Sequence, residues 1–292
     1  MTAVIPFGER LATVLETAGR LCVGIDPHAG LLDRWGLPDS ADGVREFGLR
    51  VVGAAAGLVG VVKPQIAFYE RHGAAGYLAL ERVLHEARDA GLEVIADVKR
   101  GDIGSSVEAY GEAWLTPGSS LEADAITVSP YQGLGSLEAV LRRADAAGKG
   151  VFVLAATSNP EAAAIQRAVL QQSSRAGASV GGAVVSGVTA WNQGAADASS
   201  RRLGSIGVVI GATVDLGAAG IDREGEPPRP GLPVLAPGFG HQGASATEYR
   251  GIFGALAAGV LVSESRSILG AGPDGLADVI ARRVDELGAA DG

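Results

Sequence analysis

The chain has 292 residues, 47% of them hydrophobic, and a formal net charge of -9 at pH 7. This negative charge argues against a nucleic-acid-binding protein, which would present a basic surface, although a local group of Lys and Arg could still bind a phosphorylated molecule. The single cysteine, Cys22, excludes an internal disulfide, and no Cys/His group suggests structural zinc.

The first 20 residues predict an amphipathic helix. Glu9, Arg10 and Glu16 lie inside its apolar pattern, which is not typical of a signal peptide. The longest apolar run, 51–62, is too short and too interrupted by glycine to cross a bilayer. We therefore expect a soluble, cytoplasmic protein with no membrane partner.

Short apolar runs recur along the rest of the chain and alternate with segments whose apolar residues are three to four positions apart. This alternation predicts parallel strands connected by helices. Near-continuous apolar runs such as 151–154 suit a sheet that is covered on both faces. The predicted strands are 21–26, 60–65, 93–99, 125–129, 150–157, 205–212, 232–237 and 260–263, and the predicted helices include 67–90 and 135–147.

Eight strand–helix units favour an α/β fold, a closed (β/α)8 TIM barrel, with residues 1–292 as a single domain. A doubly wound open sheet is the alternative, but no Gly-x-Gly-x-x-Gly follows the first predicted strand.

Two connections are longer than this pattern requires. Residues 159–203 are predicted to contain extra helix, with a break at Gln171-Gln172-Ser173-Ser174. Residues 216–231 include a polar, proline-rich loop, and long loops in compact domains are often functional or mobile. Because a loop that follows a barrel strand lies on the catalytic face, 216–231 is the candidate lid. The residues after Ala271 are predicted to form a closing helix.

The third predicted strand ends in a group of charges, Asp97-Val98-Lys99-Arg100-Gly101-Asp102. Side chains alternate along a strand, so Asp97 and Lys99 are expected to point the same way. Asp102 follows a glycine, at which the chain can turn sharply. Because unpaired buried charges are costly, this group predicts mutual pairing or a charged ligand. A salt-bridged strand terminus at the surface is the alternative.

Polar residues also follow other predicted strands, at the end where barrels of this class hold their active sites. Those of most interest are Asp26, Lys63, Ser158, Gln242 and Arg266. Arg266 enters a short apolar turn, where backbone N–H groups and a guanidinium make an anion site. Gln242, in a glycine-flanked loop after the seventh strand, could reach the same anion. Phosphate sites of these barrels form near the last two strands, so we predict a phosphate here; a surface salt bridge is the alternative for Arg266.

In combination, these motifs resemble the orotidine 5′-phosphate decarboxylase family over essentially the whole chain, from Asp26 to Arg266. The most specific match is 97–102, the Asp-x-Lys-x-x-Asp signature of the superfamily, and Lys63 matches a further lysine that marks the decarboxylases. The amino-acid sequence of residues 97–104 and the length of the chain resemble those of the mycobacterial-type branch. The resemblance implies decarboxylation of orotidine 5′-monophosphate to uridine 5′-monophosphate (UMP) and CO2 in pyrimidine biosynthesis, without a metal or another cofactor.

The resemblance also implies roles for individual residues. An alternating charge tetrad would comprise Lys63, Asp97, Lys99 and Asp102. Asp102 would reach the site of the neighbouring subunit in a homodimer, so the dimer would be the catalytic unit.

The implied substrate contacts come from several strand ends. Asp26 and Lys63 would hold ribose hydroxyls. Ser158 would hydrogen-bond the pyrimidine, and Ile103 would pack near it across the subunit interface. The remaining implied contacts are Ser106 at that interface and Gln242 and Arg266 at the phosphate.

The chemistry of this reaction explains why lysine is needed. Loss of CO2 from C6 of orotate leaves an electron pair that the ring cannot delocalise, so the protein must stabilise the carbanion electrostatically and supply a proton. We predict that Lys99 does both, kept charged and aimed by Asp97 and Asp102.

Two other functions stay open. One is a magnesium-dependent sugar-phosphate decarboxylase or aldolase of the same superfamily, which Lys63 disfavours because a metal site would favour a carboxylate there. The other is a non-catalytic nucleotide-binding protein.

Overall fold

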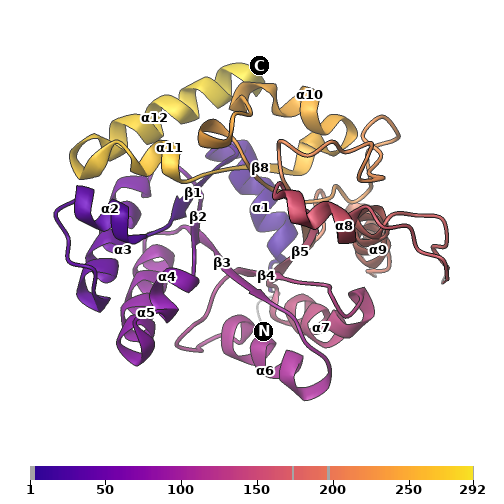
Figure 1. The fold of residues 1–292 in the computed structure, drawn as a ribbon, viewed down its shortest axis with the longest axis horizontal. Helices are drawn as coiled ribbons and strands as arrows, with labels where there is room; N and C mark the ends of the chain where they lie inside the picture. The colour runs from indigo at the N-terminus through magenta and orange to yellow at the C-terminus, as the bar shows by residue number, and fades with distance from the viewer. Residues whose placement is uncertain (1–3, 173, 196–197, 292) are drawn as a thin grey trace.

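Eight parallel strands close into a barrel in chain order, and helices surround it (Figure 1). This computed structural model describes residues 4–172, 174–195 and 198–291. The barrel closes where Leu21 of the first strand pairs with Val262 of the last. The strands are β1 (Leu21–Ile25), β2 (Val61–Pro64), β3 (Glu93–Arg100), β4 (Ala125–Val128), β5 (Gly150–Ala156), β6 (Ile206–Ile210), β7 (Val234–Pro237) and β8 (Val260–Glu264). The predicted (β/α)8 TIM barrel is confirmed, and each predicted strand agrees to within two residues at either end.

The helices fill the connections as the apolar spacing predicted. They are α1 (Phe7–Thr17), α2 (Ala29–Arg34), α3 (Ala41–Ala55), α4 (Ala67–Glu70), α5 (Gly73–Asp89), α6 (Gly104–Leu115), α7 (Glu138–Ala147), α8 (Ala163–Gln166), α9 (Val180–Gln193), α10 (Tyr249–Phe253), α11 (Arg266–Leu269) and α12 (Gly272–Asp291). The predicted single helix over 67–90 is wrong in one respect, because it is divided into α4 and α5. Gly73 begins α5 with φ of 59°, a left-handed conformation that interrupts a right-handed helix. In the described part of the chain, no helix combines the length and the apolar character needed to cross a membrane.

Helix α1 closes one end of the barrel, and it is seen behind the strands in Figure 1. Phe7 is fully buried against Phe152 of β5, edge to face, with ring centroids 6.0 Å apart. Gly150 makes this contact possible, because a Cβ there would lie 2.3 Å from the Phe7 ring. The barrel interior is therefore filled from the N-terminal ends of the strands, and a substrate pocket can open only at the other end.

The first long connection contains extra helix, as predicted. It holds a 3-10 turn (Pro160–Ala162) and α8, then α9 and a second 3-10 turn (Ala198–Ser200). Helix α9 begins at a side-chain cap, in which Ser179 Oγ accepts a hydrogen bond from Gly182 N at 2.9 Å. The predicted break lies between the two helices, although Ser173 itself is outside the described residues.

The closed end of the barrel carries partly buried ion pairs between strand ends. Arg10 of α1 binds Glu93 at 2.7 Å and Asp124 at 3.0 Å. Lys149 binds the same Asp124 at 3.2 Å and Glu122 at 2.8 Å. Burial raises the pKa of Glu93, and its hydrogen bond to Arg10 opposes that rise. The group therefore ties α1 to the ends of several strands.

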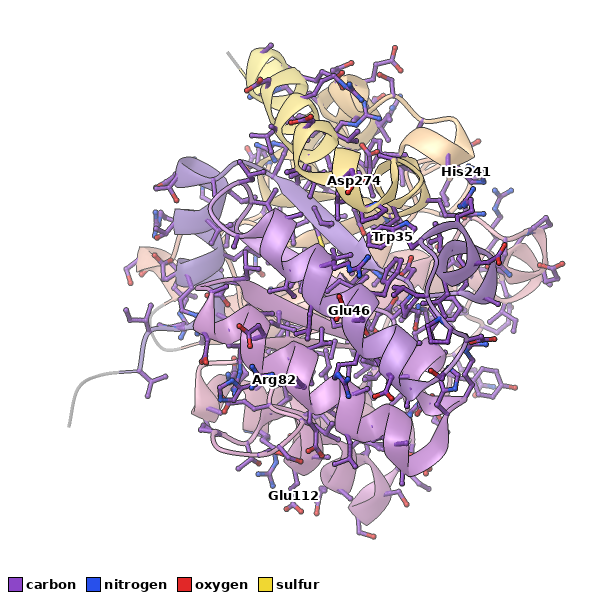
Figure 2. The ribbon with its side chains drawn as sticks, turned by 90° about the vertical axis from the view of Figure 1, so that its left-hand side faces the viewer. Trp35, Glu46, Arg82, Glu112, His241 and Asp274 are labelled. Carbon is purple, nitrogen blue, oxygen red and sulfur yellow. The ribbon has the colours of Figure 1, made fainter. Side chains whose placement is uncertain are left out.

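We expect Arg10→Met to lower the free energy of unfolding by roughly 2–3 kcal/mol, because Glu93 and Asp124 would lose their shared cation while remaining partly buried. Urea-unfolding curves would measure this loss. Arg82→Met is the matched control, because Arg82 pairs with Glu86 on the exposed outer face of α5 (Figure 2). That variant should change stability by less than about 0.5 kcal/mol, and equal losses in the two variants would contradict the assignment.

Candidate active site

A pocket of about 440 Å³ opens at the C-terminal ends of the strands, opposite α1. Its floor is apolar, and its charged wall comes from β2 and β3. The lining residues are Lys63, Gln65, Asp97, Lys99, Thr127, Leu154, Thr157, Ser158, Asn159, Val209, Leu235, Pro237 and Ser263. The structure thus brings three of the four predicted tetrad residues into one pocket.

Asp97 is the centre of this wall. Lys99 Nζ lies 2.6 Å from Asp97 Oδ1, and Lys63 Nζ lies 3.1 Å from Asp97 Oδ2. The side chains of Lys63 and Asp97 are only 10% and 9% exposed, whereas that of Lys99 is 47% exposed. One carboxylate therefore binds two ammonium groups, of which Lys99 is the one that solvent or a substrate can reach.

Burial and charge act against each other on these groups. Burial raises the pKa of Asp97, but the charges of Lys63 and Lys99 outweigh it and hold that pKa well below its usual range. Burial lowers the pKa of Lys63, but the charges of Asp97 and Asp26 outweigh it and hold that pKa above its usual value. Asp97 and Lys63 therefore stay charged at neutral pH. The folded-state pKa of Asp97 is below its unfolded value, so its carboxylate stabilises the fold at neutral pH and this contribution is lost only as the pH falls through the acidic range.

Strand β3 reaches this arrangement through an irregularity that regular alternation did not predict. Ala96 pairs with Ile126 of β4 and Arg100 pairs with Val128, so two extra residues of β3 bulge out opposite Thr127. Lys99 has φ of 46°, and it is the one non-glycine residue with positive φ in the described part of the chain. Asp97 and Lys99 do point into the same pocket, but the bulge, as well as the pleat of the strand, places Lys99.

Two neutral side chains complete the binding of Asp97. Thr127 Oγ1 donates to Asp97 Oδ1 at 2.8 Å, and Gln65 Nε2 donates to Asp97 Oδ2 at 2.8 Å. Neither Thr127 nor Gln65 is among the site residues predicted from the sequence. The available signal was their position at the ends of two predicted strands next to the charged one.

Asp26 lies at the end of β1, close enough to Lys63 for its charge to act on that lysine. Its Oδ2 accepts a short hydrogen bond from Ser265 Oγ. Its Oδ1 is buried and has no hydrogen-bond partner in the described part of the chain. A buried carboxylate oxygen without a partner is ready to accept a hydrogen bond from a ligand hydroxyl.

Asp102 does not join the lysines within this single chain. Its Oδ1 accepts a hydrogen bond from Ile103 N at 2.9 Å, and it makes no ion pair with any described residue. Ile103 is 61% exposed, and Ser106 in the first turns of α6 is also exposed. These three predicted residues therefore lie together on the surface beside the pocket.

Ser158, Gln242 and Arg266 lie at the ends of three other strands. Ser158 follows β5 and lines the pocket. Gln242 lies in a 3-10 turn (Gly240–Gln242) after β7, and its side chain is outside the described part. Arg266 begins α11, is exposed, and makes no ion pair among the described residues. Burial lowers the pKa of His28, the charge of Arg34 adds to this, and the charge of Asp26 opposes it, so charges of both signs act at this rim.

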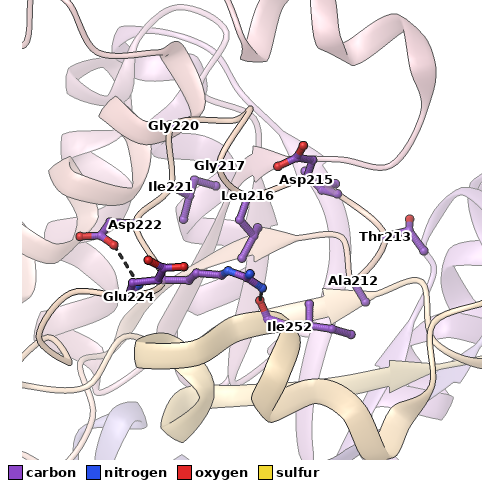
Figure 3. A pocket seen from close by; sticks show the side chains of 12 residues that line it. Ala212, Thr213, Asp215, Leu216, Gly217, Gly220, Ile221, Asp222, Glu224 and Ile252 are labelled. Carbon is purple, nitrogen blue, oxygen red and sulfur yellow. Dashed lines mark hydrogen bonds between the residues drawn. The ribbon is translucent and has the colours of Figure 1, made fainter.

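The candidate lid does not line this pocket. Leu216, Ala219 and Ile221 are buried, so the first part of the loop is packed into the core. Residues 212–217 and 220–224, together with Ile252, line a separate hollow of about 780 Å³ (Figure 3), where Asp222 accepts a hydrogen bond from Glu224 N at 2.9 Å. Arg223 O accepts a hydrogen bond from Ala255 N, which ties the loop to the segment before β8. The loop is longer than the pattern requires, as predicted, and its role as a lid stays a prediction.

The donor set of the pocket does not suit a metal ion. Both oxygens of Asp97 already accept two hydrogen bonds, and their charged partners are ammonium groups. Among the residues that the structure describes, no group of three or more His, Cys, Asp and Glu could hold a metal.

Comparison with known proteins agrees with this geometry. The family model described as "Orotidine 5′-phosphate decarboxylase / HUMPS family" matches residues 19–277. An orotidine 5′-phosphate decarboxylase of Nocardioides sp. is 47% identical over 97% of this chain and 99% of its own, and one of Salinispora tropica is 49% identical over 92% and 91%. A crystal structure from Streptomyces avermitilis named for the same activity superposes with a TM-score of 0.89, at 43% identity, over 99% of this chain and 97% of its own.

Proposed function

Because the chain belongs to the orotidine 5′-phosphate decarboxylase / HUMPS family, we propose that it converts orotidine 5′-monophosphate to UMP and CO2 with its own side chains alone. The observation that carries this proposal is the single carboxylate of Asp97 bound to both Lys63 and Lys99 at the open end of the barrel. A fixed ammonium beside C6 of the orotate ring meets both needs of the reaction: its positive charge stabilises the carbanion, and it can donate a proton to C6.

The reaction has two steps at C6, loss of CO2 and then protonation. The bond from C6 to the carboxylate breaks, CO2 leaves, and its electron pair stays on C6. Lys99 Nζ then gives a proton to C6 and becomes a neutral amine, which regains a proton from solvent. Asp97 holds the Lys99 ammonium in place until that transfer through the hydrogen bond to its Oδ1. Lys63 balances the remaining charge of Asp97 from the buried side.

The other predicted residues hold the substrate around this centre. The unpartnered oxygen of Asp26 accepts a hydrogen bond from a ribose hydroxyl, and Lys63 lies beside it. Ser158, which also lines the pocket, binds the pyrimidine edge. Arg266 and Gln242 bind the phosphate at the rim.

A second copy of this chain completes the site in this proposal. The carboxylate of Asp102 makes no ion pair with a described residue and lies beside the pocket, with Ile103 and Ser106 next to it. In a homodimer these residues enter the partner's pocket, where Asp102 adds the second carboxylate next to Lys99. We place this dimeric enzyme in the cytoplasm, where nucleotide biosynthesis takes place.

The test is the loss of orotate-ring absorbance when the purified chain is mixed with orotidine 5′-monophosphate, with and without a strong chelator. Equal rates in the two conditions are expected, because no described residue group suits a metal. A chelator-sensitive reaction on a hexulose phosphate, without loss of orotate absorbance, would instead favour the magnesium-dependent branch of the family. UMP binding without turnover would favour a non-catalytic nucleotide-binding protein.

We expect Arg266→Ala to weaken binding of UMP by about 100-fold, because a guanidinium–phosphate contact contributes a strong, charge-assisted pair of hydrogen bonds. Isothermal titration would measure this against uridine, which lacks the phosphate and should lose less than about threefold. Arg34→Ala is the control variant, because it removes a positive charge that acts at the same rim and leaves Arg266 in place. An equal loss for UMP and uridine would argue against a phosphate contact at Arg266.

A further inference from the structure

Within the proposed decarboxylase site, the four donors to Asp97 are divided evenly between its two oxygens. Oδ1 accepts from Lys99 Nζ at 2.6 Å and from Thr127 Oγ1 at 2.8 Å. Oδ2 accepts from Lys63 Nζ at 3.1 Å and from Gln65 Nε2 at 2.8 Å. Each oxygen thus has one charged and one neutral donor. The carboxylate cannot rotate toward either lysine without breaking a neutral hydrogen bond.

Thr127 has a second contact that Gln65 lacks. Its Oγ1 accepts a hydrogen bond from the Lys99 N–H at 2.9 Å. The bulge in β3 leaves Thr127 as the one residue of β4 opposite 97–99, so the strand ladder cannot satisfy this N–H. This backbone donor is partly shielded from solvent and needs a partner, and the hydroxyl of Thr127, a residue that is 1% exposed, provides it.

This second contact bears on the conformation of Lys99. Its φ of 46° lies in the left-handed region, which is disfavoured for a residue with a Cβ and persists only where the surroundings hold it. The Thr127 hydroxyl binds the backbone of Lys99 and also binds the carboxylate that receives the Lys99 ammonium. Both ends of the lysine are therefore held through one oxygen atom.

We propose that Thr127 is a positioning residue for the decarboxylation: it orients Asp97 and fixes the backbone of Lys99, so that the ammonium is held where C6 will lie. Gln65 supports the other oxygen of Asp97 and is a weaker positioning residue. This inference rests on the proposed function, but neither side chain needs to touch the substrate.

Thr127→Val is the first test, because valine keeps the shape of threonine and removes only the hydroxyl. We expect kcat to fall by about 10- to 100-fold, as for loss of a hydrogen bond to a charged group, and KM to change by less than about threefold. Thr127→Ser keeps the hydroxyl and should restore kcat to within about fivefold of the wild-type value. Gln65→Met, which removes one neutral donor and leaves the Lys99 backbone held, should lower kcat by a smaller factor, about 3- to 10-fold.

Two controls separate positioning from a general structural role. UMP affinity, measured for every variant, should stay within about threefold of wild type if the pocket is intact. Ser205→Ala removes a buried hydroxyl at the closed end of the barrel, where it accepts a hydrogen bond from Gly8 N at 3.2 Å, and should leave kcat unchanged. If Thr127→Val also loses UMP affinity, kcat and UMP affinity are measured for Thr127→Ala, which lacks the hydroxyl too but places no methyl group in its position.

The outcomes that overturn the inference are distinct from failure of the proposed function. Wild-type kcat in Thr127→Val would overturn it, and so would equal loss in the Val and Ser variants. A change confined to KM would instead make Thr127 a substrate contact. If the wild-type chain does not turn over orotidine 5′-monophosphate at all, the proposed function fails first.

Discussion

Lys99→Ala should reduce turnover of orotidine 5′-monophosphate by at least about 10⁴-fold, since it removes the proton donor and the charge that stabilises the carbanion together. The fold should survive, because the Lys99 side chain is nearly half exposed and Asp97 keeps Lys63, Gln65 and Thr127 as donors. Affinity for UMP should stay measurable, and stopped-flow absorbance with a UMP titration would give both quantities. Turnover near the wild-type rate would remove Lys99 from the chemistry.

Lys99→Arg separates charge from proton transfer. A guanidinium keeps the positive charge next to Asp97, but it cannot release a proton at neutral pH. The chain contains 24 Lys and Arg residues, of which three are lysine: Lys63, Lys99 and Lys149. Two of these three line the pocket, and the third is held at the closed end by Glu122 and Asp124. Because the guanidinium keeps its proton, we expect Lys99→Arg to be inactive in turnover. Lys99→Ala and Lys99→Arg should bind UMP with comparable affinity.

Mixing two inactive variants should restore activity if Asp102 is shared between subunits. Lys99→Ala and Asp102→Ala are each expected to have less than about 1% of wild-type turnover. After exchange of subunits, half of the dimers are mixed, and one of their two sites has both native residues. The mixture should therefore recover about a quarter of the wild-type activity.

The control for this experiment is a mixture of Lys99→Ala with Asp97→Ala. Lys99 and Asp97 bind each other within one chain, so exchange of subunits cannot rebuild a complete site. Activity that stays at the average of the two parents in both mixtures would place Asp102 outside the partner's pocket. An active wild-type monomer in sedimentation would also show that Asp102 is not needed in a partner's pocket.

The barrel could be predicted from the sequence because its signal is repeated along the whole chain. Eight apolar runs alternate with helical spacing, and the strand ends carry the polar residues. The meeting of Lys63, Asp97 and Lys99 also followed from this, because neighbouring parallel strands end at the same rim. Local errors, such as the division of one helix at Gly73, came from backbone conformation, which apolar spacing does not reveal.

The finer geometry of the site depends on contacts that no spacing rule contains. The bulge in β3 and the positive φ of Lys99 lie opposite Thr127 on the next strand, 28 residues further along the chain, whose hydroxyl accepts a hydrogen bond from Lys99 N. Thr127 and Gln65 look like ordinary strand-end residues until Asp97 is seen between them. The length and polarity of the loop 216–231 do not reveal that its first part is anchored by three buried apolar side chains, Leu216, Ala219 and Ile221.

The claim that Lys99 replaces CO2 at C6 with a proton can be tested in one reaction. Orotidine 5′-monophosphate labelled with ¹³C in its carboxylate is mixed with the enzyme in D2O and followed by NMR. The expected result is one labelled CO2 per UMP formed, with deuterium at C6, for the wild-type chain, and neither product for Lys99→Ala. Release of labelled CO2 by Lys99→Ala at the wild-type rate would contradict the account.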